Sequence, residues 1–166
     1  MEIRCACDED LDAIMELVKR AVEGMQNEGL RQWNETYPNR QIISGDIASG
    51  TLFPIIIDGE IAGIIVLNES QSPEYGELKW EDTGGRYLVI HRLCIHPGLR
   101  RQGLAKQLMQ FAEEYAGTKG YSSIRTDTFQ ENHKILAMLG SLGYEPRGKV
   151  SFGKRSGFFH CFEKRI

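Results

Sequence analysis

The stretch "RYLVIHRLCIHPGLRRQGLAKQLM" (residues 86–109) decides the fold, because it joins an apolar strand to a helix through a basic, glycine-containing loop. Residues 86–95 are mostly apolar, which is typical of a buried strand. Beyond the loop, apolar residues recur at helical spacing, with Leu104 and Leu108 on one face. Another apolar segment, "YSSIRTDTF" (residues 121–129), follows this helix. The order strand, loop, helix, strand predicts a β-α-β unit.

The segments on either side complete a mixed architecture. Strands are predicted at residues 2–8, 51–68 (a hairpin), 86–95, 121–129 and 150–166 (a second hairpin), and helices at residues 8–25, 41–47, 103–120 and 132–144. The dipeptide Asp58-Gly59 is typical of the tight turn of a hairpin. Together these elements predict an α/β (α+β) fold in a single domain, residues 1–166.

Composition and charge exclude several function classes. Apolar residues make up 41% and charged residues 26% of the 166 residues, and the formal net charge is -3, so no basic field for nucleic acid is expected. The start, "MEIRCACDED", lacks the basic and apolar regions of a signal peptide. The stretch "IAGIIVL" is too short to span a bilayer. We therefore expect a cytoplasmic protein with neither a nucleic-acid nor a membrane partner.

The four cysteines predict no metal centre. Cys5 and Cys7 form a C-x-C pair inside the predicted first strand, where alternation puts both side chains on one face. We interpret them as two small core residues. Cys94 and Cys161 stand alone, and no second Cys or His pair completes a zinc pattern.

The loop before the helix at residues 103–120 has the chemistry of an anion site. The first backbone N–H groups of a helix have no partner within it, and the helix dipole adds positive potential there. Gly103 lacks a Cβ and Ala105 is small, so a bulky anion can approach the backbone, beside the charges of Arg100, Arg101 and Lys106. These features suit a diphosphate. A purely structural basic turn is the alternative, because neither a Walker sequence nor a dinucleotide fingerprint is present.

The whole arrangement resembles the GNAT superfamily of acyl-CoA-dependent N-acetyltransferases. The motif [Q/R]-x-x-G-x-[G/A] is satisfied by Arg100 to Ala105, "LVIHRLCIHP" looks like the central strand, and "TDTFQENHKILAMLGSLGYEPRG" (residues 126–148) looks like the next strand and helix. The resemblance implies a mixed, mostly antiparallel central sheet with splayed central strands, flanked by helices. It also implies acetyl-CoA as co-substrate and direct attack of a primary amine on the thioester.

The resemblance also implies which residues bind the co-substrate. The basic loop would hold the diphosphate, the strand around residues 93–95 would pair with the pantetheine arm and stabilise the oxyanion, and an asparagine would reach toward that arm. The residues are Leu93, Cys94, Ile95, Arg100, Arg101, Gln102, Gly103, Leu104, Ala105, Lys106 and Asn132.

Two residues are candidates for the general base. Asp127 lies where some N-terminally acetylating relatives carry an acidic residue, and the alternative is a salt bridge with Arg125 or Arg92. His91 lies in the middle of the predicted strand, and the alternative is a buried, hydrogen-bonded histidine. A bulge in that strand would change which face His91 occupies.

One position departs from the family pattern. Many relatives carry a tyrosine in the last helix as the general acid, and the matching position here is Leu139, whereas Tyr144 falls on a packing position. Water, His91 or a loop tyrosine could assist the leaving thiolate instead. The departure also leaves open a non-catalytic acyl-CoA binding or sensing module.

The resemblance implies that the acceptor is a small-molecule or peptide amine. Aromatic residues in the irregular segments could line its pocket or form a satellite core: Trp33, Tyr37, Tyr75 and Trp80. The acidic segment of residues 69–82 could attract a cationic amine or be a solvated face. Family members often dimerise, and the C-terminal hairpin could form a homodimer contact.

Overall fold

The computed structural model describes residues 1–153 and 157–166. The strands are β1 (Glu2–Ile3), β2 (Leu52–Ile57), β3 (Glu60–Asn68), β4 (Tyr87–Ile95), β5 (Ser123–Phe129), β6 (Glu145–Val150) and β7 (Phe159–Arg165). The helices are α1 (Leu11–Asn27), α2 (Arg40–Ala48), α3 (Leu104–Lys119) and α4 (His133–Ser141), with 3₁₀ turns η1 (Asp8–Asp10), η2 (Pro73–Glu77) and η3 (Pro97–Leu99).

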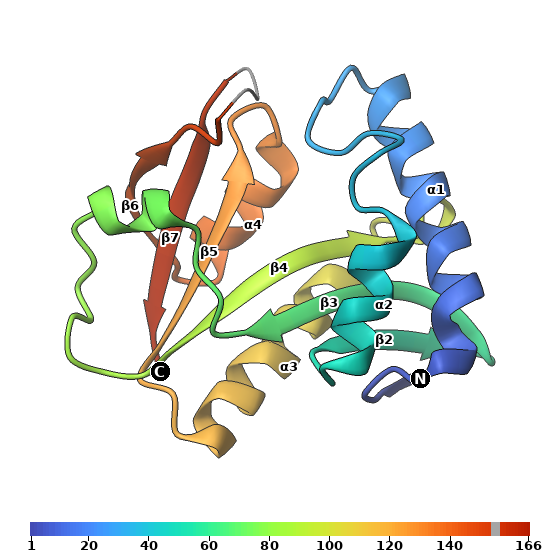
Figure 1. The fold of residues 1–166 in the computed structure, drawn as a ribbon, viewed down its shortest axis with the longest axis horizontal. Coiled ribbons are helices and arrows are strands. Elements are labelled where there is room, and N and C mark those ends of the chain that lie inside the picture. The colour runs from blue at the N-terminus through green and yellow to red at the C-terminus, as the bar shows by residue number, and fades with distance from the viewer. Residues whose placement is uncertain (154–156) are drawn as a thin grey trace. The chain divides into compact units, whose positions relative to one another are not determined.

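The strands form one sheet in the order β1-β2-β3-β4-β5-β7-β6. Strand β4 runs parallel to β5, as the β-α-β prediction requires, and the β1–β2, β2–β3, β5–β7 and β6–β7 pairs are antiparallel. The predicted mixed, mostly antiparallel fold is thereby confirmed. The chain groups into two compact units, a first unit of Met1–Leu67 with Arg92–Phe111 and a second unit of Asn68–His91 with Ala112–Ile166. Strand β4 and helix α3 each run from one unit into the other (Figure 1).

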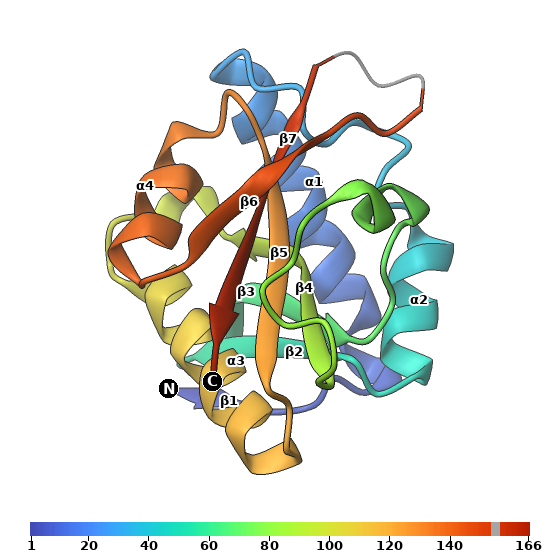
Figure 2. The same ribbon diagram turned by 90° about the vertical axis from the view of Figure 1, so that its left-hand side faces the viewer.

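In the first unit, helices cover both faces of the β2–β3 hairpin (Figure 2). The predicted turn is confirmed, because Asp58 and Gly59 have φ values of 51° and 83°. Leu52, Ile64 and Val66 point into a core that α1 and α2 close with their apolar sides. The intervening Phe53 packs on Phe111 of α3, with ring centroids 5.2 Å apart. Helices α1 and α2 therefore lie on one face of the hairpin and α3 on the other (Figure 2).

The second unit is built on β5, β7 and β6. Helix α4 covers one face of these strands, and the loop of residues 69–86, which contains η2, covers the other (Figure 2). The predicted C-terminal hairpin is confirmed as the β6–β7 pair, although residues 154–156 of the predicted range lie outside the described residues. Strand β6 begins at Glu145, earlier than predicted, because Pro146 and a register shift before Gly148 hide the strand pattern.

The prediction for Cys5 and Cys7 is wrong. Both thiols are exposed, whereas Ala6 between them is buried. Strand β1 ends at Ile3, and the Ala6 N–H then donates to the Leu52 carbonyl 2.9 Å away, so the methyl group of Ala6 takes the inward position. Among the described residues, no helix has the length and apolarity needed to cross a membrane.

Candidate active site

The second half of β4 and the loop after it lie in the first unit. Gly63 on β3 allows β4 to approach closely, because a Cβ there would lie 2.7 Å from the Cys94 carbonyl oxygen and 2.5 Å from Ile95 Cδ1. Cys94 itself belongs to the hydrophobic core, and burial raises the pKa of its thiol to about 12. The Cys94 side chain is therefore an inert core group.

Arg92 breaks the regular geometry of β4 immediately before that segment. Its φ of 51° lies in the left-handed region, which a non-glycine residue rarely adopts. Its guanidinium donates to both carboxylate oxygens of Asp46 on α2, at 2.7 Å each, and to the Tyr37 hydroxyl at 3.2 Å. A bidentate pair of this kind fixes the arginine geometry strongly. The predicted acceptor residue Tyr37 thus bonds the arginine that ends the regular part of β4.

The loop between β4 and α3 is shaped by two left-handed residues, Arg101 with φ 66° and Gly103 with φ 78°. The N–H of Gln107 donates to the Gly103 carbonyl at 3.1 Å, so the amides of residues 103–106 precede the first α-helical bond of α3. A Cβ at Gly103 would meet no atom within 4 Å, so the space beside this glycine is open. The loop therefore fits the predicted diphosphate cradle.

The three cationic side chains around this loop are not equally available to bind an anion. Arg100 forms an ion pair with Glu28 at the end of α1, at 2.6 Å. Arg101 and Lys106 are exposed, and neither forms an ion pair with another described residue. Gln102 is exposed too, whereas Leu104 is buried and anchors the start of α3. Two of the three predicted cations are therefore available to an anion.

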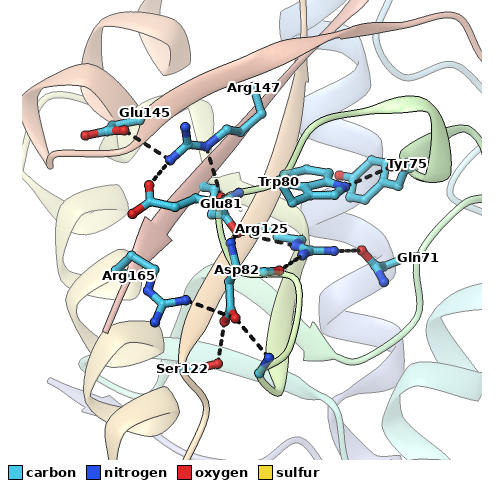
Figure 3. A network of polar contacts seen from close by, with 12 residues as sticks. Gln71, Tyr75, Trp80, Glu81, Asp82, Ser122, Arg125, Glu145, Arg147 and Arg165 are labelled. Carbon is cyan, nitrogen blue, oxygen red and sulfur yellow. Dashed lines mark hydrogen bonds and ion pairs between the residues drawn. The ribbon is translucent and has the colours of Figure 1, made fainter.

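A polar network fastens the loop of residues 69–86 to the sheet of the second unit (Figure 3). Arg125 of β5 is only 4% exposed and lies between the rings of Trp80 and Tyr87, at 4.2 and 3.8 Å from their centroids. It donates to Gln71 Oε1 at 2.7 Å and to the Asp82 carbonyl at 2.6 Å. The predicted acceptor residue Trp80 is thus engaged in holding this loop.

The acidic side chains of that loop are largely neutralised by arginines. Glu81 pairs with Arg147, and Glu69 pairs with Arg86 at 2.7 Å. Asp82 accepts from Ser122 and pairs with Arg165 at 2.9 Å, and the bond from Ser122 is the main cause that lowers the pKa of Asp82 to about 2. These three carboxylates therefore form neither a simple solvated face nor an unpaired acidic surface for a cationic amine.

Asp127, the first candidate base, faces the same loop. Its Oδ2 accepts a hydrogen bond of 2.6 Å from the Tyr75 hydroxyl of η2. The two arginines that were alternative partners bind other carboxylates, Arg92 that of Asp46 and Arg125 that of Glu163. Burial, followed by the Asp127 charge, raises the pKa of Tyr75 far above its usual value. Tyr75 therefore stays protonated and donates to the carboxylate.

His91, the second candidate, anchors the other end of the loop. Its Nε2 lies 3.0 Å from both Asn68 Oδ1 and the Ser70 carbonyl oxygen. Because a carbonyl oxygen only accepts, Nε2 must carry a proton in this arrangement. This nitrogen is therefore engaged as a donor, and any proton that His91 accepts would have to go to Nδ1.

Four predicted residues remain, three of them on or beside α4, which ends at Ser141 and not at residue 144 as predicted. Asn132 caps α4, and its Oδ1 accepts from the Ile135 N–H at 3.4 Å. Leu139 is 2% exposed inside α4, so a buried aliphatic side chain occupies the position of the family's acid, and Tyr144 is buried as well. Trp33 belongs to the hydrophobic core of the first unit. Among residues 1–153 and 157–166, no cluster of three or more His, Cys, Asp or Glu is placed to hold a metal ion.

Sequence reasoning missed the residues that support these sites. Asp46, Gln71 and Glu163 bear charges or amides that no local motif distinguishes from surface residues. Only their partners in space, Arg92 for the first and Arg125 for the other two, reveal what they do.

Comparison with known proteins agrees with this architecture. The sequence pattern described as the acetyltransferase (GNAT) family matches residues 18–144. The uncharacterized N-acetyltransferase YesJ of Bacillus subtilis (strain 168) is 29% identical over 161 residues, which cover 95% of this chain and 86% of that protein.

Solved structures lead to the same group. A GNAT-family acetyltransferase from Streptococcus agalactiae 2603 has a TM-score of 0.86 and 30% identity, covering 99% of this chain and 95% of its own. The PaiA N-acetyltransferase from Thermoplasma acidophilum, in complex with coenzyme A, shares the fold with a TM-score of 0.73 at 16% identity, covering 99% and 98%. Since the family pattern spans most of the chain and the fold agrees throughout, the protein belongs to the acetyltransferase (GNAT) family and is an acyltransferase.

Proposed function

We propose that this protein transfers the acetyl group of acetyl-CoA to the primary amine of a small molecule or a peptide. The observation that carries the proposal is the loop between β4 and α3, where amides that precede the first α-helical bond adjoin the open space at Gly103. Membership in the acetyltransferase (GNAT) family and the coenzyme A bound to the PaiA neighbour support it. Acetyl-CoA would supply the acetyl group as a thioester that an amine can attack.

The chain's residues divide the work of binding. The amides of residues 103–106 would hold the diphosphate, with Arg101 and Lys106 beside it. The backbone of Leu93–Ile95 would pair with the pantetheine arm, and one of its N–H groups would stabilise the oxyanion. Asn132 is our candidate for a further polar contact to the pantetheine.

Asp127 would accept the proton that the reaction releases. In the transfer, the amine nitrogen bonds to the carbonyl carbon, the carbon–sulfur bond breaks with its electron pair on sulfur, and one proton leaves the nitrogen. A carboxylate within reach of that nitrogen typically contributes about 10²–10⁴-fold to the rate. The thiolate needs little acid assistance, because a thiol has a pKa of about 8.5, and water can protonate it. A buried leucine at position 139 is compatible with this route.

Two measurements test the proposal. The chain is incubated with acetyl-CoA and a panel of amines, comprising polyamines, amino acids, aminoglycosides and peptides with free N-termini or lysines, while free thiol is detected. We expect amine-dependent thiol release with at least one class. Coenzyme A should also raise the melting temperature, because a ligand that binds only the native state stabilises it.

The alternative of a non-catalytic acyl-CoA binding module, which rests on Leu139, would contradict the assignment as an acyltransferase. It predicts a melting temperature raised by coenzyme A without thiol release from any amine. The absence of both effects would reject both candidates.

A further inference from the structure

We infer that Tyr75 is a positioning residue for Asp127, and that the loop of residues 69–86 serves as a rigid support that delivers the Tyr75 hydroxyl to this carboxylate. The inference rests on the proposed function, because it assigns Asp127 the role of proton acceptor. It adds a role for a loop tyrosine and for the arginine that holds the loop.

The hydrogen bond itself has the geometry of a strong, charge-assisted contact. The Tyr75 hydroxyl lies 2.6 Å from Asp127 Oδ2, and the tyrosine is 3% exposed. Hydroxyl–carboxylate bonds of this length are stronger than those between neutral groups. The bond restrains the rotation of the carboxylate, so its other oxygen keeps a defined direction.

The loop holds Tyr75 in place through Trp80 and Arg125. Trp80 Nε1 donates to the Tyr75 carbonyl at 2.8 Å, and the two rings pack with centroids 5.1 Å apart. Trp80 also packs on Arg125, which binds Gln71 and the Asp82 carbonyl. Figure 3 shows Trp80 and Gln71 of the loop beside Arg125.

The contacts of Arg125, Trp80, Tyr75 and Asp127 begin and end on the same strand, β5. Arg125 and Asp127 are two residues apart on β5, so their side chains leave the same face of the sheet. The series of contacts therefore runs from Arg125 through Trp80 and Tyr75 to Asp127. Glu163 of β7, opposite Arg125 in the register, pairs with the guanidinium at 3.7 Å and fixes the base of the support.

Three groups that lie next to Asp127 keep their charge state near neutral pH. Tyr75 of η2 stays protonated, and Arg125 of β5 stays cationic. Cys161 lies directly opposite Asp127 on β7, and burial raises the pKa of its thiol to about 12, so it stays neutral. A hydrogen bond to the ionised carboxylate favours that form. Loss of the Tyr75 hydroxyl should therefore make Asp127 harder to ionise.

The test compares Tyr75→Phe with the unmodified protein, using the amine found in the panel. We expect kcat to fall by about tenfold, because the variant loses one hydrogen bond to a charged group. The acid limb of the kcat/KM profile for the amine should move to higher pH by about one unit. The KM for acetyl-CoA should stay unchanged, a split that a general loss of structure would not produce.

Three further variants make the result specific. Asp127→Asn should lower the rate more than Tyr75→Phe, and the double variant should be no slower than Asp127→Asn, because the tyrosine acts only through the carboxylate. Tyr121→Phe is the matched control: its hydroxyl donates to Glu69 of the same loop at 2.8 Å, and its loss should leave the acid limb in place. If Tyr75→Phe does not fold, Trp80→Phe removes the bond to the Tyr75 carbonyl and should move the acid limb in the same direction.

The outcomes separate the two proposals. No thiol release by the unmodified protein would reject the proposed function and this inference together. Thiol release with an unshifted acid limb in Tyr75→Phe, or in Trp80→Phe where that variant is used, would overturn the inference alone. Additive losses in the double variant would overturn it as well.

Discussion

Arg92 of β4 binds the carboxylate of Asp46 on α2 with two hydrogen bonds of 2.7 Å, while its own backbone holds a φ of 51°. Both side chains are largely buried, at 14% and 10% exposure. Left-handed conformations of non-glycine residues cost about 1–3 kcal/mol and persist only where surrounding contacts impose them. Helix α2 thus supplies a contact that holds the irregular turn of β4 just before the segment that we assign to the pantetheine arm.

Asp46→Asn should be strongly destabilising, because it leaves the Arg92 guanidinium buried without its counter-charge. We expect the free energy of unfolding, measured with urea, to fall by about 3 kcal/mol. Asp12→Asn is the matched control, because its pair with Arg40 is exposed. That change should have little effect. Equal losses in the two variants would show that the Arg92–Asp46 pair has no special role.

Gly63→Ala should displace the second half of β4. The new Cβ would lie 2.7 Å from the Cys94 carbonyl oxygen, and a backbone atom cannot move aside as a flexible side chain can. We expect a loss of about 1–3 kcal/mol in unfolding free energy and weaker coenzyme A binding by calorimetry.

Gly45→Ala in α2 is the control for that substitution, because its Cβ would meet no atom within 4 Å. It should stabilise the protein by up to about 1 kcal/mol, since alanine is the better helix former. Coenzyme A binding that survives Gly63→Ala unchanged would contradict the role assigned to this part of β4.

Gly103→Glu should abolish the rise in melting temperature that coenzyme A produces. The carboxylate would enter the open space beside the loop and repel the diphosphate. Gly120→Glu is closely matched, because Gly120 has a φ of 74°, near the 78° of Gly103, and equally open space. Both variants carry the same backbone strain and charge, and Gly120→Glu should retain the full thermal shift. A retained shift in Gly103→Glu would reject the cradle.

Asp82→Asn should reduce the acid sensitivity of the fold. The pKa of Asp82 is lowered to about 2 in the native state, chiefly by Ser122, against about 3.9 in an unfolded chain. Its ionised form therefore adds stability above the unfolded value, and that contribution is lost as the pH falls through about 4 toward 2. We expect a clear stability difference between Asp82→Asn and the unmodified protein at about pH 7 that narrows at about pH 3.

Urea unfolding at both pH values gives this comparison. Glu77→Gln is the control, because this exposed carboxylate of the same loop should leave the pH dependence unchanged. A constant difference between Asp82→Asn and the unmodified protein across the range would show that Asp82 contributes no proton linkage.

The elements that were predicted well are those whose signals are local. The Asp58-Gly59 turn, the β-α-β order and the motif from Arg100 to Ala105 depend on residues close together in the chain. Backbone preference and side-chain periodicity act over a few residues, so the amino-acid order is enough to recognise them. The prediction for Cys5 and Cys7 failed because β1 pairs with β2 only at Glu2 and Ile3, and no neighbouring residue in the sequence marks that limit.

The sequence by itself determined the family and the loop suited to a diphosphate, because motif and helix start are contiguous in the chain. It also supplied Asp127 and Tyr75 as separate candidates. Only the tertiary structure decided that these two residues bond each other across 52 positions, that Arg92 bonds Asp46 across 46, and that arginines neutralise much of the acidic loop. The partner of a charged side chain depends on distance and burial in the folded chain, and neither can be predicted from spacing along the sequence.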